Sequence, residues 1–159
     1  MGTVLLKDLD IQVNLMNPIP MLKISRSHLQ QIIMNLIINA AEAIDSPVNG
    51  SIVLKTEKYH CSHWHKTINK VGVIKDRPSG DYLILQVSDN GKGMTPETID
   101  NIFNPFFSTK PKGRGLGLAT VRDIISAYGG YITVLSQVGE GTVFQIYFPY
   151  QPDKYASIH

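Results

Sequence analysis

Apolar residues recur at helical spacing over the longest amphipathic segment of the chain, residues 27–44. The spacing i, i+3, i+4, i+7 buries one face of a helix. The apolar positions are Leu29, Ile32, Ile33, Leu36, Ile37, Ala40, Ala41 and Ile44. Ser27 and Gln30 have the spacing of a capping box and predict the start of this helix. The sequences DSP and NG that follow predict its end.

Two further helices are predicted towards the C-terminus. Thr95 is a candidate N-cap for a short helix, because Pro96 and Glu97 suit its first turn. Residues 116–128 form the second prediction, with Val121, Ile124, Ile125 and Tyr128 on the inward face. The pair Gly129-Gly130 ends this helix, because glycine adopts the left-handed conformation found after helix C-termini.

Alternation of apolar and polar residues predicts the strands. Residues 3–15 are expected to be extended, and residues 51–57 and 82–89 are expected to form strands. Residues 131–136 and 142–150 flank a turn that contains GEG and predict a hairpin.

The predicted elements follow one another in the order β-α-β-β-α-β-β. This order favours an α+β two-layer sandwich, in which helices cover one face of a mixed, mostly antiparallel sheet. We expect residues 1–159 to form a single domain. Residues 58–80 have no periodicity and are interpreted as a surface insertion.

Composition narrows the class of protein. The apolar fraction of 43%, the charged fraction of 18% and the net charge of +2 are typical of a soluble domain and argue against nucleic acid as the main partner. The single cysteine, Cys61, excludes a disulfide within the chain and fits a reducing compartment. With no signal peptide and no apolar run long enough to cross a membrane, we expect a cytoplasmic domain without direct membrane contact, whose parent protein can still be membrane-anchored.

Two asparagines lie on the long predicted helix. Asn35 and Asn39 are four residues apart, which places them on one stripe beside the apolar face. They are either polar residues bonded to a neighbouring loop or a source of amide oxygen for Mg²⁺, a cation that prefers oxygen ligands.

The sequence DNGKGM, residues 89–94, directly follows the strongest predicted strand. The segment is compatible with an ordinary turn. Alternatively, Asp89 accepts a hydrogen bond from an exocyclic amine, such as the 6-amino group of adenine, while Gly91 and Gly93 let a flat ligand approach the backbone.

The segment FNPFFSTKPKGRGLGLA, residues 103–119, combines three phenylalanines, three glycines and several cations. Glycine-rich loops that open a helix often hold phosphate through backbone N–H groups, although many are only flexible turns. Lys110 is placed to reach a terminal phosphate. The segment is neither a Walker loop, which needs GxxxxGK[ST], nor a Rossmann fingerprint, which needs a preceding strand.

The sequence HCSHWH, residues 60–65, offers His60, Cys61, His63 and His65 as ligands for Zn²⁺. No second ligand pair occurs elsewhere, so an ordinary polar loop is the favoured interpretation.

The motifs become specific in combination. NxxxN on a helix, DxGxGM after a strand, FxPFF, GxGLGLA opening a helix, and GxGTxF follow one another in this order. Together they resemble the asparagine, glycine and phenylalanine boxes of the catalytic ATP-binding domain of two-component sensor histidine kinases. That domain shares a superfamily with DNA gyrase, the ninety-kilodalton heat-shock chaperones and the MutL mismatch-repair proteins. The resemblance extends over residues 22–149 and implies a Bergerat-type ATP-binding fold.

The resemblance also implies roles for individual residues. Asp89 would bind adenine, Thr142 would share a water with Asp89 and the base, and Asn39 would bind Mg²⁺. Asn35 and Lys110 would be the catalytic residues near the phosphates. The implied ATP-binding residues are Asn35, Asn39, Asp89, Gly91, Gly93, Met94, Phe103, Lys110, Gly113, Arg114, Gly115, Leu116, Gly117, Leu118 and Thr142.

The implied activity is transfer of the γ-phosphoryl group of Mg-ATP to a histidine on a separate domain, in a phosphorelay with a response regulator. Gyrase-like ATPases carry a glutamate general base where this chain has Asn35, and an amide cannot take the proton. A gyrase- or MutL-like ATPase and a non-catalytic nucleotide-binding module are the alternatives.

None of the histidines is followed by an acidic residue as in a phosphoacceptor motif. We therefore expect the dimerisation and phosphoacceptor domain to be absent and the isolated chain to lack autophosphorylation.

Overall fold

The computed structural model describes residues 6–62, 78–107 and 117–152. A short 3₁₀ helix, Leu6–Asp8, precedes strand β1. The other elements, in chain order, are β1 (Asp10–Asn14), α1 (Arg26–Glu42), β2 (Ser51–Cys61), β3 (Gly80–Asp89), α2 (Pro96–Asn101), α3 (Gly117–Ala127), β4 (Tyr131–Gln137) and β5 (Gly141–Tyr150).

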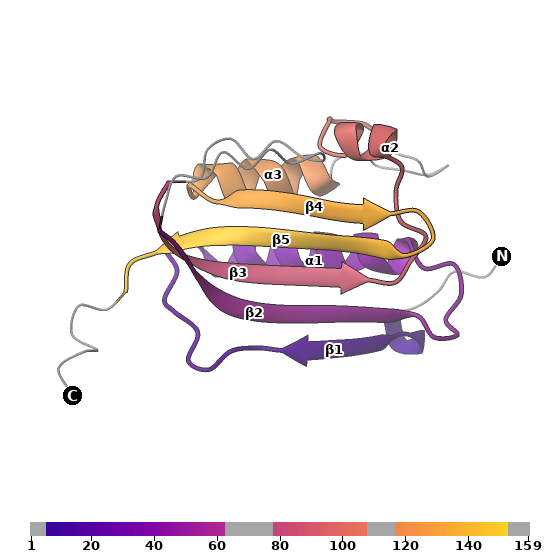
Figure 1. Ribbon diagram of the computed structural model, residues 1–159, viewed down its shortest axis with the longest axis horizontal. Coiled ribbons are helices and arrows are strands. Elements are labelled where there is room, and N and C mark those ends of the chain that lie inside the picture. The colour runs from indigo at the N-terminus through magenta and orange to yellow at the C-terminus, as the bar shows by residue number, and fades with distance from the viewer. Residues whose placement is uncertain (1–5, 63–77, 108–116, 153–159) are drawn as a thin grey trace.

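The strands form one sheet in the order β1-β2-β3-β5-β4. Strand β1 runs parallel to β2, whereas the pairs β2–β3, β3–β5 and β4–β5 are antiparallel. Helices α1 and α3 lie side by side against the same face of the sheet (Figure 1). This arrangement confirms the predicted α+β sandwich with a mixed, mostly antiparallel sheet.

The core lies between this face of the sheet and the helices. Alternate residues of β3 and β5 point inward, and they meet the apolar stripe of α1. Ile32 and Leu36 of α1 have no exposed surface. Burial of each such side chain contributes about 1.5–3 kcal/mol to folding. The largest inward sheet residues are Leu83, Leu85, Val87, Phe144, Ile146 and Phe148.

The predicted capping box at the start of α1 is wrong. Ser25 is the N-cap, since its backbone is extended and its Oγ accepts a hydrogen bond from His28 N–H at 3.2 Å. Ser27 is therefore already inside the helix. Two serines precede the apolar stripe, and Ser25, which takes the cap, also contacts Tyr128, the residue that follows α3. In this contact Ser25 N–H donates to Tyr128 Oη at 3.3 Å.

Other predicted boundaries are largely confirmed. Thr95 caps α2, where its Oγ1 accepts from Thr98 N–H. Helix α3 ends as predicted, because Gly129 has a positive φ and Gly130 N–H donates to Ile125 O at 2.9 Å. Within the described residues 6–15 of the expected extended segment 3–15, Asp10–Asn14 form a strand and Leu6–Asp8 form a 3₁₀ helix instead; residues 3–5 lie outside the described residues. The expected insertion is shorter at both ends, since β2 continues to Cys61 and β3 begins at Gly80; residues 63–77 lie outside the described residues.

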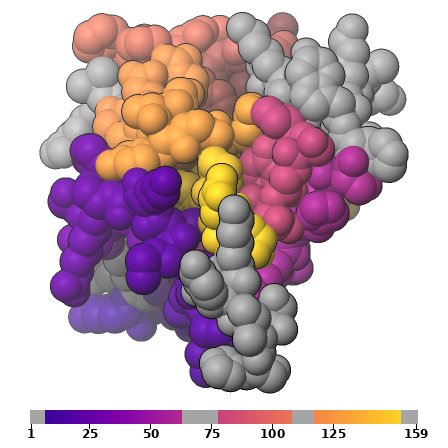
Figure 2. Space-filling view, turned by 90° about the vertical axis from the view of Figure 1, so that its left-hand side faces the viewer, coloured from indigo at the N-terminus to yellow at the C-terminus, as the bar shows by residue number. Residues whose placement is uncertain are grey.

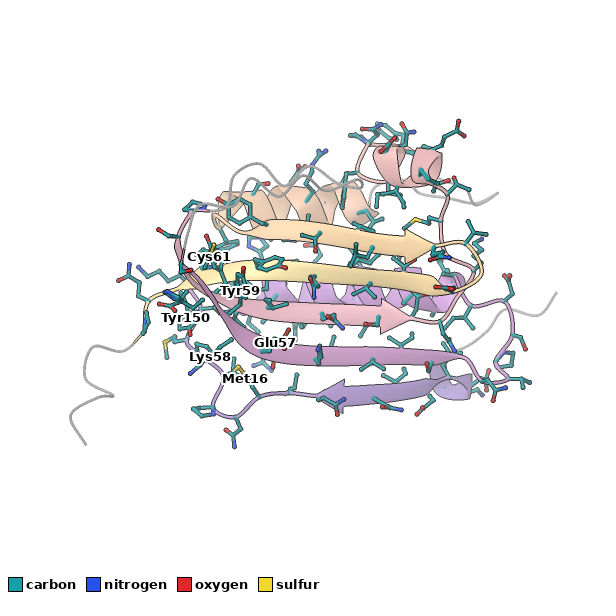
Figure 3. The ribbon with its side chains drawn as sticks, in the orientation of Figure 1. Met16, Glu57, Lys58, Tyr59, Cys61 and Tyr150 are labelled. Carbon is teal, nitrogen blue, oxygen red and sulfur yellow. The ribbon has the colours of Figure 1, made fainter. Side chains whose placement is uncertain are left out.

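The end of the sheet at which β2 and β5 finish carries a second apolar cluster on the other face. Cys61, Tyr82, Ile84 and Tyr147 are buried there. Figure 3 labels Cys61, Tyr59 and Tyr150 at this end, which is opposite the carboxyl end of β3. Figure 2 looks onto the same end, where the segment leading into α1 lies beside α3. No described helix combines the length and apolar character needed to cross a membrane.

Candidate functional site

A buried carboxylate stands at the carboxyl end of β3. Asp89 is the last residue of this strand and pairs in register with Thr142 of β5. Their exposed fractions are only 9% and 3%. The Oδ1 atom of Asp89 accepts a hydrogen bond from Gly91 N–H at 2.8 Å. Asp89 has no ion pair with a cationic side chain of the described residues, so its charge is balanced there by backbone dipoles alone.

The environment of Asp89 opposes its ionisation. Burial raises its pKa above the ordinary 3.8, and hydrogen bonds from the backbone of Gly91 and Thr142 counteract part of this effect. A partly desolvated carboxylate that accepts two hydrogen bonds still has lone pairs left, and it is a strong acceptor for an incoming N–H donor. The site is thus suited to a ligand with an amino group.

Glycines in the loops around Asp89 allow close contacts between backbone segments. A Cβ atom added at Gly91 would lie 2.5 Å from Ala43 O, and one at Gly93 would lie 2.0 Å from Gln137 O. A Cβ at Gly141 would lie 2.0 Å from Asp89 O. Each distance is shorter than any van der Waals contact. The structure therefore gives Gly91 and Gly93 a packing role, besides the ligand-approach role expected from the sequence.

Backbone hydrogen bonds fasten the loop after β3 on two sides. Lys92 N–H donates to Ala43 O, at the end of α1, at 2.8 Å. Gly139 N–H, in the turn between β4 and β5, donates to Lys92 O at 2.8 Å. The loop thus joins α1 to the hairpin and fixes the position of Asp89 relative to both.

The two asparagines of α1 lie near the same end of the sheet. Asn39 is one turn before Ala43, which accepts the bond from the loop after β3. Its side chain is half-buried and makes no hydrogen bond to another described residue, so its amide oxygen is available to a ligand. Asn35 differs, since its Nδ2 donates to Gly117 O at 3.2 Å and ties α1 to the first residue of α3. The structure thus brings Asn39 and Asp89 to one end of the fold.

The remaining described candidates divide between the core and the surface. Met94, Phe103 and Leu118 are partly buried against the main core. Gly117 opens α3, as expected for the last glycine of the glycine-rich segment. Phe106 is 79% exposed and has a φ of 65°, a left-handed conformation that is rare for a bulky residue. Lys110, Gly113, Arg114, Gly115 and Leu116 lie outside the described residues.

Two functional-site neighbours were not predicted from the sequence. Asn90 links the site to the start of β2, because its Oδ1 accepts from Ser51 N–H at 2.8 Å and its Nδ2 donates to Asn49 O at 2.6 Å. An asparagine inside a DNG turn is a sequence signal for such bonds to backbone. Ser136 of β4 bonds to Met94 N–H and to Thr142, and nothing in its sequence surroundings indicates this.

The histidine and cysteine residues at the end of β2 do not form a metal site with the described part of the chain. His60 Nδ1 lies 2.8 Å from Asp81 Oδ1, and Cys61 is buried in the second apolar cluster. No group of three or more potential metal ligands occurs in residues 6–62, 78–107 and 117–152. His63 and His65 lie outside these ranges.

The raised pKa of Asp89 predicts a pH-dependent difference between the wild-type chain and Asp89→Asn. Between pH 3.8 and the raised pKa the folded state binds more protons than the unfolded state, so this group adds stability as pH falls through that window. The variant is neutral there at every pH. At pH 7 we expect Asp89→Asn to have a higher unfolding free energy than the wild-type chain. This difference should shrink as the pH approaches 4. Urea denaturation of both proteins across this pH range measures the difference. A difference in unfolding free energy that does not change with pH would contradict the prediction.

Comparisons with known proteins agree with the fold and the motifs. The sequence matches the family described as "Histidine kinase-, DNA gyrase B-, and HSP90-like ATPase" over residues 24–152. It is 34% identical over 145 residues to "Sensor kinase CckA" of Brucella abortus (strain 2308), covering 90% of this chain and 15% of that protein. It is 38% identical over 122 residues to "Sensor histidine kinase ZraS" of Salmonella typhi, covering 76% of this chain and 22% of that protein. The chain thus spans less than a quarter of either relative.

Solved structures give the same result. The catalytic domain of the histidine kinase ThkA, in a nucleotide-free form, superposes with a TM-score of 0.66 at 27% identity, covering 91% of this chain and 82% of that one. The mycobacterial sensor histidine kinase MprB has the same fold, with a TM-score of 0.68 at 22% identity, covering 92% of this chain and 85% of that one. The chain therefore belongs to the histidine kinase-, DNA gyrase B- and HSP90-like ATPase family, as an ATP-binding catalytic domain of the sensor histidine kinase type.

Proposed function

We propose that the chain binds Mg-ATP at the end of the sheet marked by Asp89 and donates the γ-phosphoryl group to a histidine of a separate dimerisation and phosphoacceptor domain. A response regulator would then receive the phosphoryl group, and the reaction would take place in the cytoplasm. The observation that carries the proposal is the buried Asp89 carboxylate, which accepts hydrogen bonds only from backbone N–H groups of the described residues and lies at the same end of the fold as Asn39.

Adenine is the group that we place against Asp89. Its 6-amino group would donate to a remaining lone pair of the carboxylate, and the Thr142 side chain would provide a second polar contact next to it. Gly91, Gly93 and Met94 belong to the loop that lies beside this position, and hydrogen bonds to Ala43 and Ser136 hold that loop. The base would therefore lie against a loop whose backbone is already held in place by hydrogen bonds.

The phosphates are assigned to the other side of the site, between α1 and the start of α3. The amide oxygen of Asn39 is a hard ligand without a hydrogen-bond partner in the described residues, so it fits the Mg²⁺ that accompanies ATP. Bound Mg²⁺ would neutralise part of the phosphate charge. Asn35 holds Gly117 in place, and the glycine-rich segment with Lys110 would contact the phosphates.

Phosphoryl transfer needs little more from the protein than position and charge neutralisation. ATP hydrolysis by the gyrase-like route needs a general base near the γ-phosphate, and the Asn35 amide cannot accept a proton. Because Asn35 is already engaged with Gly117, it acts as a positioning residue at the junction of α1 and α3. The site should hold ATP without consuming it.

The Asn35→Asp variant tests this assignment. A carboxylate at this position has no proton to donate, so it faces Gly117 O as an unpaired acceptor, and we expect about 1–2 kcal/mol lower unfolding free energy and weaker ATP binding. Urea denaturation and calorimetric titration measure the two effects. The substitution Asn101→Asp, at a surface amide that bonds to Glu97 O within α2, is a matched control. Equal losses in both variants would contradict a specific role for Asn35.

The proposed function is tested by supplying γ-labelled ATP to the chain, alone and with a separately produced dimerisation and phosphoacceptor domain of a sensor histidine kinase. We expect no steady phosphate release by the chain alone. With the acceptor domain we expect labelled phosphohistidine, which acid removes and alkali does not. Steady release of phosphate by the isolated chain would instead support a gyrase-like ATPase, and failure to bind ATP would contradict both functions.

A further inference from the structure

Ser136 forms a hydrogen-bonded centre behind the proposed adenine pocket. It lies on β4 and pairs in register with Thr142 of β5. Its Oγ is 2.8 Å from Thr142 Oγ1, 3.1 Å from Gly141 O and 2.8 Å from Met94 N. One hydroxyl therefore contacts the threonine of the pocket, the turn before it and the loop after β3.

The hydrogen-bonding capacity of a serine hydroxyl decides how these contacts are arranged. The group has one proton and two acceptor lone pairs. Met94 N–H is a fixed donor and takes one lone pair. Gly141 O is a fixed acceptor and takes the proton of Ser136. The second lone pair then remains for Thr142, whose hydroxyl must donate to Ser136 Oγ.

This arrangement determines what Thr142 presents to a ligand. Its single proton is directed at Ser136, so only its lone pairs remain for the pocket. Asp89, which pairs with Thr142 in register, is an acceptor as well when ionised. Both polar side chains beside the base are then acceptors. An amino group suits such a pocket, whereas a carbonyl oxygen at the same place meets other oxygens.

We propose that Ser136 is a positioning residue that sets base specificity: it holds the Thr142 hydroxyl as an acceptor and so favours 6-amino purines over 6-oxo purines. The inference rests on the proposed nucleotide-binding function and deepens it. Ser136 itself need not touch the base, since it acts through Thr142.

The test compares ATP with inosine triphosphate, which differs at the base by a carbonyl oxygen in place of the 6-amino group. Without the Ser136 hydroxyl, Thr142 is free to turn its proton towards a carbonyl. For Ser136→Ala we expect the ratio of the two dissociation constants to shift by about tenfold towards inosine triphosphate, the equivalent of roughly 1.4 kcal/mol. Calorimetric titration of the full chain measures both constants.

Two controls separate positioning from a general structural role. Ser88→Ala removes a hydroxyl of β3 that accepts from Gln86, on the face of the sheet opposite the core, and should leave the ratio unchanged. Thr142→Val removes the hydroxyl through which Ser136 acts. In this background Ser136→Ala should cause no further change in the ratio. Ser136→Cys keeps the shape with weaker hydrogen bonds, and it should shift the ratio in the same direction if the alanine variant does not fold.

The outcomes are distinct. If Ser136→Ala weakens the binding of ATP and of inosine triphosphate equally, the ratio of dissociation constants stays unchanged. Ser136 would then have only a structural role, which overturns this inference but not the proposed nucleotide binding. A shift that persists in the Thr142→Val background would also overturn it. A wild-type chain that binds neither nucleotide would overturn the proposed function itself.

Discussion

Replacing Asp89 by asparagine should weaken ATP binding by about 100-fold, or roughly 2.7 kcal/mol, while making the empty protein more stable. The asparagine oxygen can still accept from Gly91 N–H, the bond that Oδ1 makes now. The amide NH₂ then occupies the place of the other carboxylate oxygen and faces the adenine amine, donor against donor. The loss combines a missing charge-assisted hydrogen bond with a new repulsion.

The stability gain has a separate cause. Burial of the Asp89 charge raises its pKa, which means that folding works against its ionisation at neutral pH. Asparagine removes that cost, so we expect an unfolding free energy about 1 kcal/mol higher at pH 7. Calorimetry and urea denaturation measure the two effects. The control is Asp123→Asn, at a side chain that is 70% exposed, where neither quantity should change much. ATP affinity within threefold of the wild type would contradict the assignment of Asp89.

The second large effect is expected at Gly141. Alanine there would put its Cβ 2.0 Å from the carbonyl oxygen of Asp89, and the backbone φ of +126° already disfavours any side chain. Because the atom in the way belongs to the backbone of a central strand, relief requires β3 and β5 to separate at the site. We expect Gly141→Ala to lower the unfolding free energy by at least about 3 kcal/mol and to weaken ATP binding.

The same turn provides a matched control for this substitution. Gly139 has a φ of +82°, but nothing lies within 4 Å of the position of its Cβ. Gly139→Ala should therefore cost only the conformational strain, about 1–2 kcal/mol. Urea denaturation of both variants gives the comparison. Equal losses at the two positions would mean that close approach to Asp89 is not what requires glycine at 141.

The sequence predicted which helices and strands exist better than it predicted the residues at which they begin and end. Strong periodicity identified α1, β3 and the β4–β5 hairpin, because one buried face imposes a regular apolar pattern. The cap of α1 was predicted at Ser27 and lies at Ser25, since both serines precede the same apolar stripe. The two differ in a contact that is remote in sequence, from Ser25 to Tyr128 after α3, which no local pattern shows. The last residues of β2, Lys58–Cys61, were missed because the buried side of the strand changes: Ile52 and Leu54 face the main core, whereas Tyr59 and Cys61 belong to the second apolar cluster on the other face.

The sequence motifs predicted which residues belong to the site, but they did not predict the hydrogen bonds between those residues. Asp89 and Thr142 were expected to act together, and the structure pairs them in register. The bond from Asn35 to Gly117 and the bond from Met94 to Ser136 join residues that are far apart in the sequence, so no local pattern encodes them. Gly91 and Gly93 were assigned to the ligand, whereas a contact with neighbouring backbone is a sufficient reason for glycine at both positions.

A calorimetric titration of the chain with ATP and, in parallel, with GTP, in the presence of Mg²⁺, tests whether adenine binds at Asp89. We predict saturable binding of ATP and about 100-fold weaker binding of GTP, because the 6-oxo group of guanine meets the oxygens of Asp89 and Thr142. Equal affinity for the two nucleotides, or no binding of ATP, would contradict the placement of adenine against Asp89.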